Sequence, residues 1–151
     1  MIAIGKKAPG FTLKDQHDQD ISLEDYKGQK VIVYFYPKDD TSGCTKEALG
    51  FTESLKKFES KNTIVLGVSK DSVKSHDKFC NKYDLKHTLL SDPECKMIDE
   101  YDAWQEKSMY GKTYMGIQRS TVLIDENGIV LKHWPKVKVP GHVDAVLESL
   151  N

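Results

Sequence analysis

The sequence predicts an α/β fold with a mixed central sheet flanked by helices, and three stretches carry this prediction. Residues 31–36 form an apolar run of β-branched and aromatic residues, which is typical of a strand buried on both faces. Residues 63–69 form a second run of this kind. Between them, residues 44–58 repeat apolar side chains at steps of three and four, as an amphipathic helix does. If the two strands lie parallel, a right-handed crossover joins them.

Shorter patterns predict the remaining elements. Proline is tolerated in the first turn of a helix, so we expect a helix to begin at residues 91–93 and to carry Trp104 on its apolar side. The polar residues 105–116 are expected to form a long connection, and Asn127-Gly128 a hairpin turn. The other expected strands are 11–13, 21–23, 87–90, 120–124 and 129–134. For residues 21–23, the alternative is the entry to a helical turn at 23–26. Two further helices are expected, one from residue 73 and one over 143–150.

Composition and charge exclude several classes of protein. We expect residues 1–151 to form a single domain, since this length is enough for one hydrophobic core. The 22 basic and 23 acidic residues are mixed and leave a net charge of −1, which argues against nucleic acid and membranes as partners. No signal peptide is recognisable, and three cysteines do not resemble a secreted disulfide framework. We therefore expect a cytoplasmic protein.

Cys44 is the strongest candidate for a reactive group. It follows the polar turn 37–43, in which Thr41 or Ser42 can cap the next helix. This places Cys44 in the first helical turn, where free N–H groups and the helix dipole favour a thiolate. Cys95 also falls near an expected helix start, but acidic neighbours disfavour its thiolate. Cys80 lies on the apolar side of its helix and late in it, where the dipole opposes ionisation.

Other chemistries have weaker support in the sequence. No Cys-x-x-Cys pair is present, and the histidines and cysteines lack the close spacing of zinc ligands, so we expect no metal site and no cofactor. Neither glycine-rich nucleotide motif occurs. A cysteine hydrolase would need a histidine near the thiol, and no spacing supports any of the four that could approach it, which are His76, His87, His133 and His142.

Arg119 stands out because it is the only arginine among 22 basic residues. A chain that otherwise uses lysine has reason to keep arginine where a planar group with several donors is required. The helix-strand order places Cys44 at the carboxyl end of a central strand, where open α/β sheets carry their sites. With two short strands before the central run, this is the layout of a thioredoxin-like fold with an N-terminal β extension.

Two sequence blocks resemble the peroxiredoxins, in particular the bacterioferritin comigratory protein or peroxiredoxin Q subfamily. The first is Pro-x-x-x-Thr-x-x-Cys, matched by Pro37, Thr41 and Cys44 within residues 35–48. The second is the arginine-bearing strand, matched by residues 116–125. Ser91-Asp92-Pro93 and the start Ala8-Pro9-Gly10-Phe11 also fit, so that the resemblance covers essentially the whole chain.

The resemblance implies a cysteine peroxidase that reduces hydrogen peroxide and organic hydroperoxides. Cys44 would attack the peroxide as a thiolate and become a sulfenic acid. Arg119 would favour the thiolate and donate hydrogen bonds to the peroxide oxygens. Thr41 would orient the sulfur and a peroxide oxygen, and Pro37 would shield the pocket from water. The resemblance further implies recycling by thioredoxin or a similar dithiol, and we expect a monomer.

The sequence departs from the subfamily pattern at two positions. Ser42 replaces the usual proline between Thr41 and Gly43, and Leu49 stands where many members carry a resolving cysteine. Some relatives resolve from the following helix instead, and Cys80 matches that placement. Cys95 has no assigned role. The alternatives are a one-cysteine peroxidase with an external resolving thiol, and a redox sensor or binding domain of thioredoxin fold that does not turn over.

Overall fold

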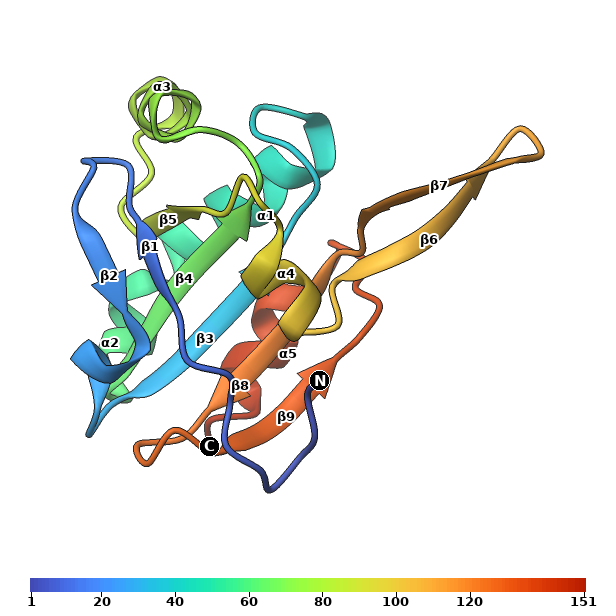
Figure 1. The fold of residues 1–151 in the computed structure, drawn as a ribbon. Helices are drawn as coiled ribbons and strands as arrows, with labels where there is room; N and C mark the ends of the chain where they lie inside the picture. Colours follow the sequence, from blue (N-terminus) through green and yellow to red (C-terminus); the bar gives the residue numbers. More distant parts are fainter.

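The computed structural model describes residues 1–151 and has a seven-stranded mixed sheet at its centre (Figure 1). The strand order is β2-β1-β5-β4-β3-β8-β9. The β3–β4 and β4–β5 pairs are parallel, and the other pairs are antiparallel. The strands are β1 (Thr12–Lys14), β2 (Asp20–Ser22), β3 (Lys30–Phe35), β4 (Thr63–Ser69), β5 (Thr88–Ser91), β8 (Ser120–Ile124) and β9 (Val130–Trp134), with β6 (Trp104–Met109) and β7 (Lys112–Ile117) outside the sheet. The helices are the 3-10 helix η1 (Leu23–Tyr26), α1 (Ser42–Glu53), α2 (Leu55–Ser60), α3 (Val73–Tyr83), α4 (Lys96–Glu100) and α5 (His142–Glu148).

The sheet separates two hydrophobic cores because both faces of β3 are buried. Val31, Val33 and Phe35 point into one core, and the alternate residues Ile32 and Tyr34 point into the other. The first core is covered by α4 and the second by α1, α2, α3 and α5. In Figure 1, α4 lies in front of the sheet, and α1, α2 and α5 lie behind it. The predicted α/β class and thioredoxin-like arrangement are therefore confirmed.

The two central strands were predicted closely from sequence, and their parallel pairing agrees with the expected crossover. Residues 63–69 form β4 as expected, and β3 begins and ends one residue before the predicted range. In the N-terminal extension, both the expected strand and the alternative helical turn form within residues 21–26, since β2 passes directly into η1. The hairpin between β8 and β9 also forms, with Gly128 in a left-handed conformation at φ 81°. None of the helices is both long enough and apolar enough to cross a membrane.

Two predicted helices were wrong in part. The helix after Cys44 is interrupted at Ser54, whose ψ of 4° ends α1 before α2 begins. The helix expected to begin at residues 91–93 begins later, at Lys96, and forms only the short helix α4. Cys95 precedes it in a left-handed conformation at φ 59°. Trp104 begins β6 rather than lying on that helix.

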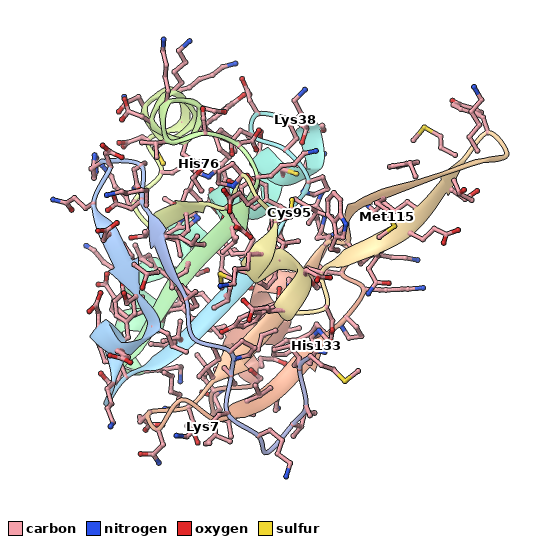
Figure 2. All side chains as sticks on the ribbon, in the orientation of Figure 1. Lys7, Lys38, His76, Cys95, Met115 and His133 are labelled. Atoms are coloured by element: carbon pink, nitrogen blue, oxygen red, sulfur yellow. The ribbon has the colours of Figure 1, made fainter.

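The expected long connection over residues 105–116 is a two-stranded hairpin. Strands β6 and β7 pair antiparallel around Tyr110 and Gly111, which both have positive φ. The hairpin extends away from the sheet, and Figure 2 shows Met115 on it, distant from the body of the protein. Tyr-Gly is not among the dipeptides that mark such a turn, which explains why the sequence pattern did not reveal it.

Candidate active site

Cys44 lies in the first turn of α1, just beyond the carboxyl end of β3. Thr41 is the N-cap residue of this helix, with the extended backbone that the position requires. The Cys44 side chain is buried, with a relative exposure of 2%. The sulfur is therefore held at a helix N-terminus, as the sequence predicted, and it is also largely shielded from bulk water.

Arg119 reaches Cys44 from the start of β8, the strand that pairs with β3. Its Nη2 donates a hydrogen bond to the Cys44 sulfur over 3.3 Å. Gly43 makes room for this contact, since a Cβ at that position would lie 3.3 Å from Arg119 Nη2. The structure thus brings together the only arginine and the cysteine at the helix start, although 74 residues separate them in the sequence.

Glu47 is a site residue that the sequence reasoning missed. Its Oε1 accepts a hydrogen bond of 2.7 Å from Arg119 Nη1, while Oε2 has no partner within the protein. The side chain is fully buried, and this burial raises the pKa of Glu47 to about 7 even though the Arg119 charge lowers it. The signal was present, because Glu47 stands one turn after Cys44 on the otherwise apolar face of the helix.

Arg119 therefore holds the thiol and the buried carboxylate at once through separate nitrogen atoms. Burial by itself lowers the pKa of Arg119, but the charge of Glu47 and the Cys44 sulfur outweigh it, and the pKa is raised overall. The guanidinium remains charged at any pH at which the protein is folded. A planar group with fixed donors can bridge two acceptors in this way, whereas an ammonium has a single nitrogen.

We expect the Glu47→Gln variant to gain stability relative to the wild type as the pH rises. A carboxyl whose pKa is raised on folding contributes its full stability below its unfolded value of 4.5 and loses it as pH rises through about 7. Glutamine does not titrate. Between pH 5 and pH 8, the difference in unfolding free energy should therefore shift by about 2.5 kcal/mol in favour of the variant.

Urea unfolding of both proteins at the two pH values measures this shift. Burial lowers the pKa of His87 and of His142 to about 4, but both titrate in the two proteins alike and cancel in the difference. A difference between the proteins that does not change with pH would contradict the assignment of Glu47 as a strained buried acid.

Thr41 and Pro37 lie in the loop that precedes α1. The Thr41 hydroxyl donates to the Lys38 carbonyl over 2.9 Å and makes no hydrogen bond to Cys44 in this state. Its oxygen can still accept a hydrogen bond, because the proton is used in the contact with Lys38. Pro37 is half-buried, two residues after the end of β3. Both remain candidate site residues because of their position in this loop.

The three cysteines are divided by the sheet. Cys44 and Cys80 belong to the same core, together with Tyr34 of β3. Cys95 packs against the opposite core, beside α4, and Figure 2 shows it in front of the sheet. All three thiols are free. Cys80 is therefore the only other thiol on the face that carries Cys44.

Neither Cys80 nor Cys95 has the surroundings of a reactive thiol. Burial raises the pKa of Cys80 to about 12, and the charges of Asp39 and Asp77 add to the effect. Burial also raises the pKa of Cys95, and the Asp92 carboxylate raises it further. The sequence placed Cys80 late in its helix and on the apolar side, and desolvation on that side is the largest cause of its raised pKa.

The histidines and the potential metal ligands lie apart from the thiol. No histidine forms a hydrogen bond with Cys44, and His76, His87 and His142 are bound to other partners, so the structure does not support a cysteine hydrolase. Asp39, Asp71 and His76 place three potential ligand atoms within 4.8 Å of one another. These atoms already hydrogen-bond within the protein, as the 2.7 Å contact between His76 Nδ1 and Asp39 shows. The cluster therefore fits a structural network better than an ion site.

Comparison with known proteins identifies the family. Residues 4–133 match the AhpC/TSA family model. A Coxiella burnetii relative named putative peroxiredoxin bcp is 51% identical over 149 residues, covering 99% of both chains. Peroxiredoxin Bcp of Bacillus subtilis is 47% identical over 149 residues, covering 99% of this chain and 95% of its own.

A solved structure supports the same assignment. The Xanthomonas campestris bacterioferritin comigratory protein, described for its alkyl peroxide reduction activity, has a TM-score of 0.89 at 43% identity and covers 93% of this chain and 89% of its own. Structures of that protein, also named peroxiredoxin Q, include two cysteine-to-serine mutants whose substituted cysteines are 36 positions apart. From its sequence blocks, its site and these relatives, the chain belongs to the AhpC/TSA family, within the Bcp or peroxiredoxin Q group of peroxiredoxins.

Proposed function

We propose that this thiol peroxidase reduces hydrogen peroxide and organic hydroperoxides at Cys44. The observation that carries the proposal is the 3.3 Å hydrogen bond from Arg119 Nη2 to the Cys44 sulfur at the start of α1. The guanidinium charge and the helix N-terminus both favour the thiolate, which is the form that attacks a peroxide. Burial of the sulfur keeps water from competing for these donors.

The first step consumes one peroxide molecule. The Cys44 thiolate attacks the terminal oxygen of the hydroperoxide, an S–O bond forms and the O–O bond breaks. The sulfur becomes a sulfenic acid, and the leaving oxygen takes a proton and departs as water or an alcohol. Arg119 donates hydrogen bonds to the oxygens as negative charge moves onto the leaving one. Thr41 accepts a hydrogen bond from the attacked peroxide oxygen, and Pro37 excludes water.

We further propose that Cys80 resolves the sulfenic acid. The Cys80 sulfur attacks the Cys44 sulfur, water leaves, and an intrachain disulfide forms. A dithiol such as thioredoxin then reduces this bond and becomes a disulfide itself. Two observations support the pairing: Cys80 shares a core with Cys44, and the 36 positions between them equal the separation of the mutated cysteines in the Xanthomonas campestris structures.

The pairing requires a change of shape. Cys80 lies inside the continuous helix α3 and Cys44 inside α1, and both thiols are free. Disulfide geometry requires the two Cα atoms to lie within about 7 Å. Because each thiol is held in a separate helix, we infer that at least one helix unwinds locally when the bond forms. We infer that the chain works in this way as a single domain and a monomer in the cytoplasm. Its three unpaired thiols agree with a reducing compartment.

Treatment with one equivalent of hydrogen peroxide should produce a Cys44–Cys80 disulfide in the wild type. Peptide mass spectrometry identifies the bond, and a non-reducing gel should show a monomer. The Cys80→Ser variant should stop at the sulfenic acid, over-oxidise readily and lose thioredoxin-supported turnover. Cys95→Ser is the matched control, because it removes a thiol from the opposite face, and it should retain both the disulfide and turnover.

Two results would contradict parts of this proposal. An oxidised wild type without an intrachain bond that still turns over with a small thiol would indicate a one-cysteine peroxidase. Oxidation of Cys44 without turnover in the presence of either reductant would indicate a redox sensor.

A further inference from the structure

The loop between β3 and α1 holds the last turn of α3 through one carboxylate. Asp40 accepts a hydrogen bond of 2.7 Å from the Lys82 ammonium at Oδ2, and one of 2.6 Å from the Tyr83 hydroxyl at Oδ1. These bonds lower the pKa of Asp40. Lys82 and Tyr83 are the last two residues of the helix that contains Cys80. Asp40, four positions before Cys44, therefore contacts the last turn of the helix that carries Cys80.

The same loop holds the first half of α3 through a second, buried attachment. Asp39 accepts hydrogen bonds from Ser75 Oγ at 2.8 Å and from His76 Nδ1 at 2.7 Å, while Tyr36 donates to its other oxygen over 2.6 Å. His76 Nε2 contacts the Leu90 carbonyl oxygen at 2.9 Å. Figure 2 shows His76 inside the body of the protein beside α3.

The two attachments differ in burial. The Asp39–His76 pair is almost completely buried, with exposures of 4% and 0%. The Asp40–Lys82 pair is exposed, at 41% and 59%. Breaking a buried hydrogen-bonded pair leaves both groups without water or other partners, whereas an exposed ion pair separates into solvent at little cost. The first half of α3 is therefore anchored firmly, and its last turn is held by contacts that can open.

Cys80 lies at the boundary between the two halves. Its carbonyl oxygen accepts the hydrogen bonds that end the helix, from the N–H of Asp84 and from the N–H of Leu85 at 3.0 Å. While these bonds hold, the thiol is buried at 7% exposure. Opening of the last turn exposes Cys80 without disturbing the anchored half. The geometry thus permits a partial unwinding that the Asp40 carboxylate opposes.

We propose that Asp40 is a positioning residue that sets the rate of disulfide formation by holding Lys82 and Tyr83 in the closed helix. The inference rests on the proposed role of Cys80 as the resolving thiol. When Asp40 releases the turn, Cys80 moves toward the Cys44 sulfenic acid, the S–S bond forms and water leaves. When Asp40 holds the turn, the sulfenic acid persists and a second peroxide can oxidise it to the sulfinic acid.

The Asp40→Asn variant tests this proposal without disturbing the backbone. Asp40 has a left-handed φ of 58°, which asparagine also tolerates. The variant removes the charge that holds Lys82. Because exposed pairs of this kind are weak, the conversion of sulfenic acid to disulfide should be about two- to fivefold faster. Oxidation of Cys44 by the first peroxide should proceed at the wild-type rate.

Tyr83→Phe and Asp84→Asn complete the experiment. Tyr83→Phe removes only the hydroxyl that contacts Asp40 and should also accelerate the disulfide step. Asp84→Asn is the matched control, because Asp84 is also exposed and left-handed at φ 53°, but its partner is Lys86 beyond α3. Asp84→Asn should leave the rate of disulfide formation unchanged. Rapid quenching with dimedone and alkylating reagent, followed by mass spectrometry, measures sulfenic acid and disulfide separately.

The outcomes separate this inference from the proposed function. If the wild type forms no Cys44–Cys80 disulfide, the role of Cys80 itself is wrong. If the wild type forms it and Asp40→Asn forms it at the same rate or more slowly, only the role of Asp40 is overturned. Hydrogen exchange of the oxidised wild type gives an independent check, since residues 80–85 should exchange faster than residues 73–77.

Discussion

The Cys44→Ser variant is expected to lose all measurable peroxidase activity. A serine hydroxyl is not ionised at neutral pH and cannot accept an oxygen atom as sulfur does, so no sulfenic acid forms. The rest of the site should survive, because serine fits the space of the buried thiol and Arg119 keeps its bond to Glu47. Peroxide consumption with excess dithiol reductant measures the loss, and the unfolding free energy shows whether the variant remains folded.

The Cys95→Ser variant provides the contrast for this result. It removes a thiol from the face of the sheet away from Cys44, and most of the activity should remain. Substantial turnover in Cys44→Ser would show that another thiol attacks the peroxide. Loss of activity in Cys95→Ser, with the fold intact, would show that the two faces are chemically coupled.

Arg119→Lys should slow the reaction of Cys44 with peroxide by about 10²-fold, the typical cost of removing one donor that stabilises transition-state charge. The variant keeps the positive charge but has a single nitrogen, which cannot hold Cys44 and Glu47 through separate atoms as Nη2 and Nη1 do. Stopped-flow measurement of Cys44 oxidation, under single-turnover conditions, gives the rate without a contribution from recycling.

A second reagent separates charge from donor geometry at Arg119. Alkylation by iodoacetamide requires the thiolate but no donors to a peroxide oxygen, so in Arg119→Lys it should fall much less than peroxide reduction does. If both rates fell equally, the arginine would act only through its charge. If the peroxide rate matched the wild type, the argument from the lone arginine would fail.

The fold and the centre of the site could be predicted from the sequence because both depend on local patterns. The apolar runs of β3 and β4 are short and rich in β-branched and aromatic residues, which favours buried strands over helices, and the polar turn between β3 and α1 places Cys44 at a helix start. Arg119 was found because it is chemically unique in the chain. That it touches Cys44 is a property of the β3–β8 pairing, which no local pattern reports.

The features that escaped prediction depend on tertiary contacts. Glu47 is buried only because Arg119 lies across from it, and a charged residue on a helix is ordinarily assigned to solvent. The β6–β7 hairpin turns at Tyr110-Gly111, a pair without a strong turn signal. The α4 helix is shorter than its apolar spacing suggested, because the chain leaves it at Tyr101 and Trp104 enters a strand.

The sheet separates the two cores, and this separation restricts which pairs of cysteines can form a disulfide in the folded chain. Three thiols allow three intrachain disulfides, but only Cys44 and Cys80 share a face. Local unwinding lets a thiol move over its own face, whereas a bond to Cys95 would require a passage through β3 and its neighbours. Scrambling would therefore require global unfolding, and repeated oxidation and reduction should return the folded protein to the same disulfide without help from an isomerase.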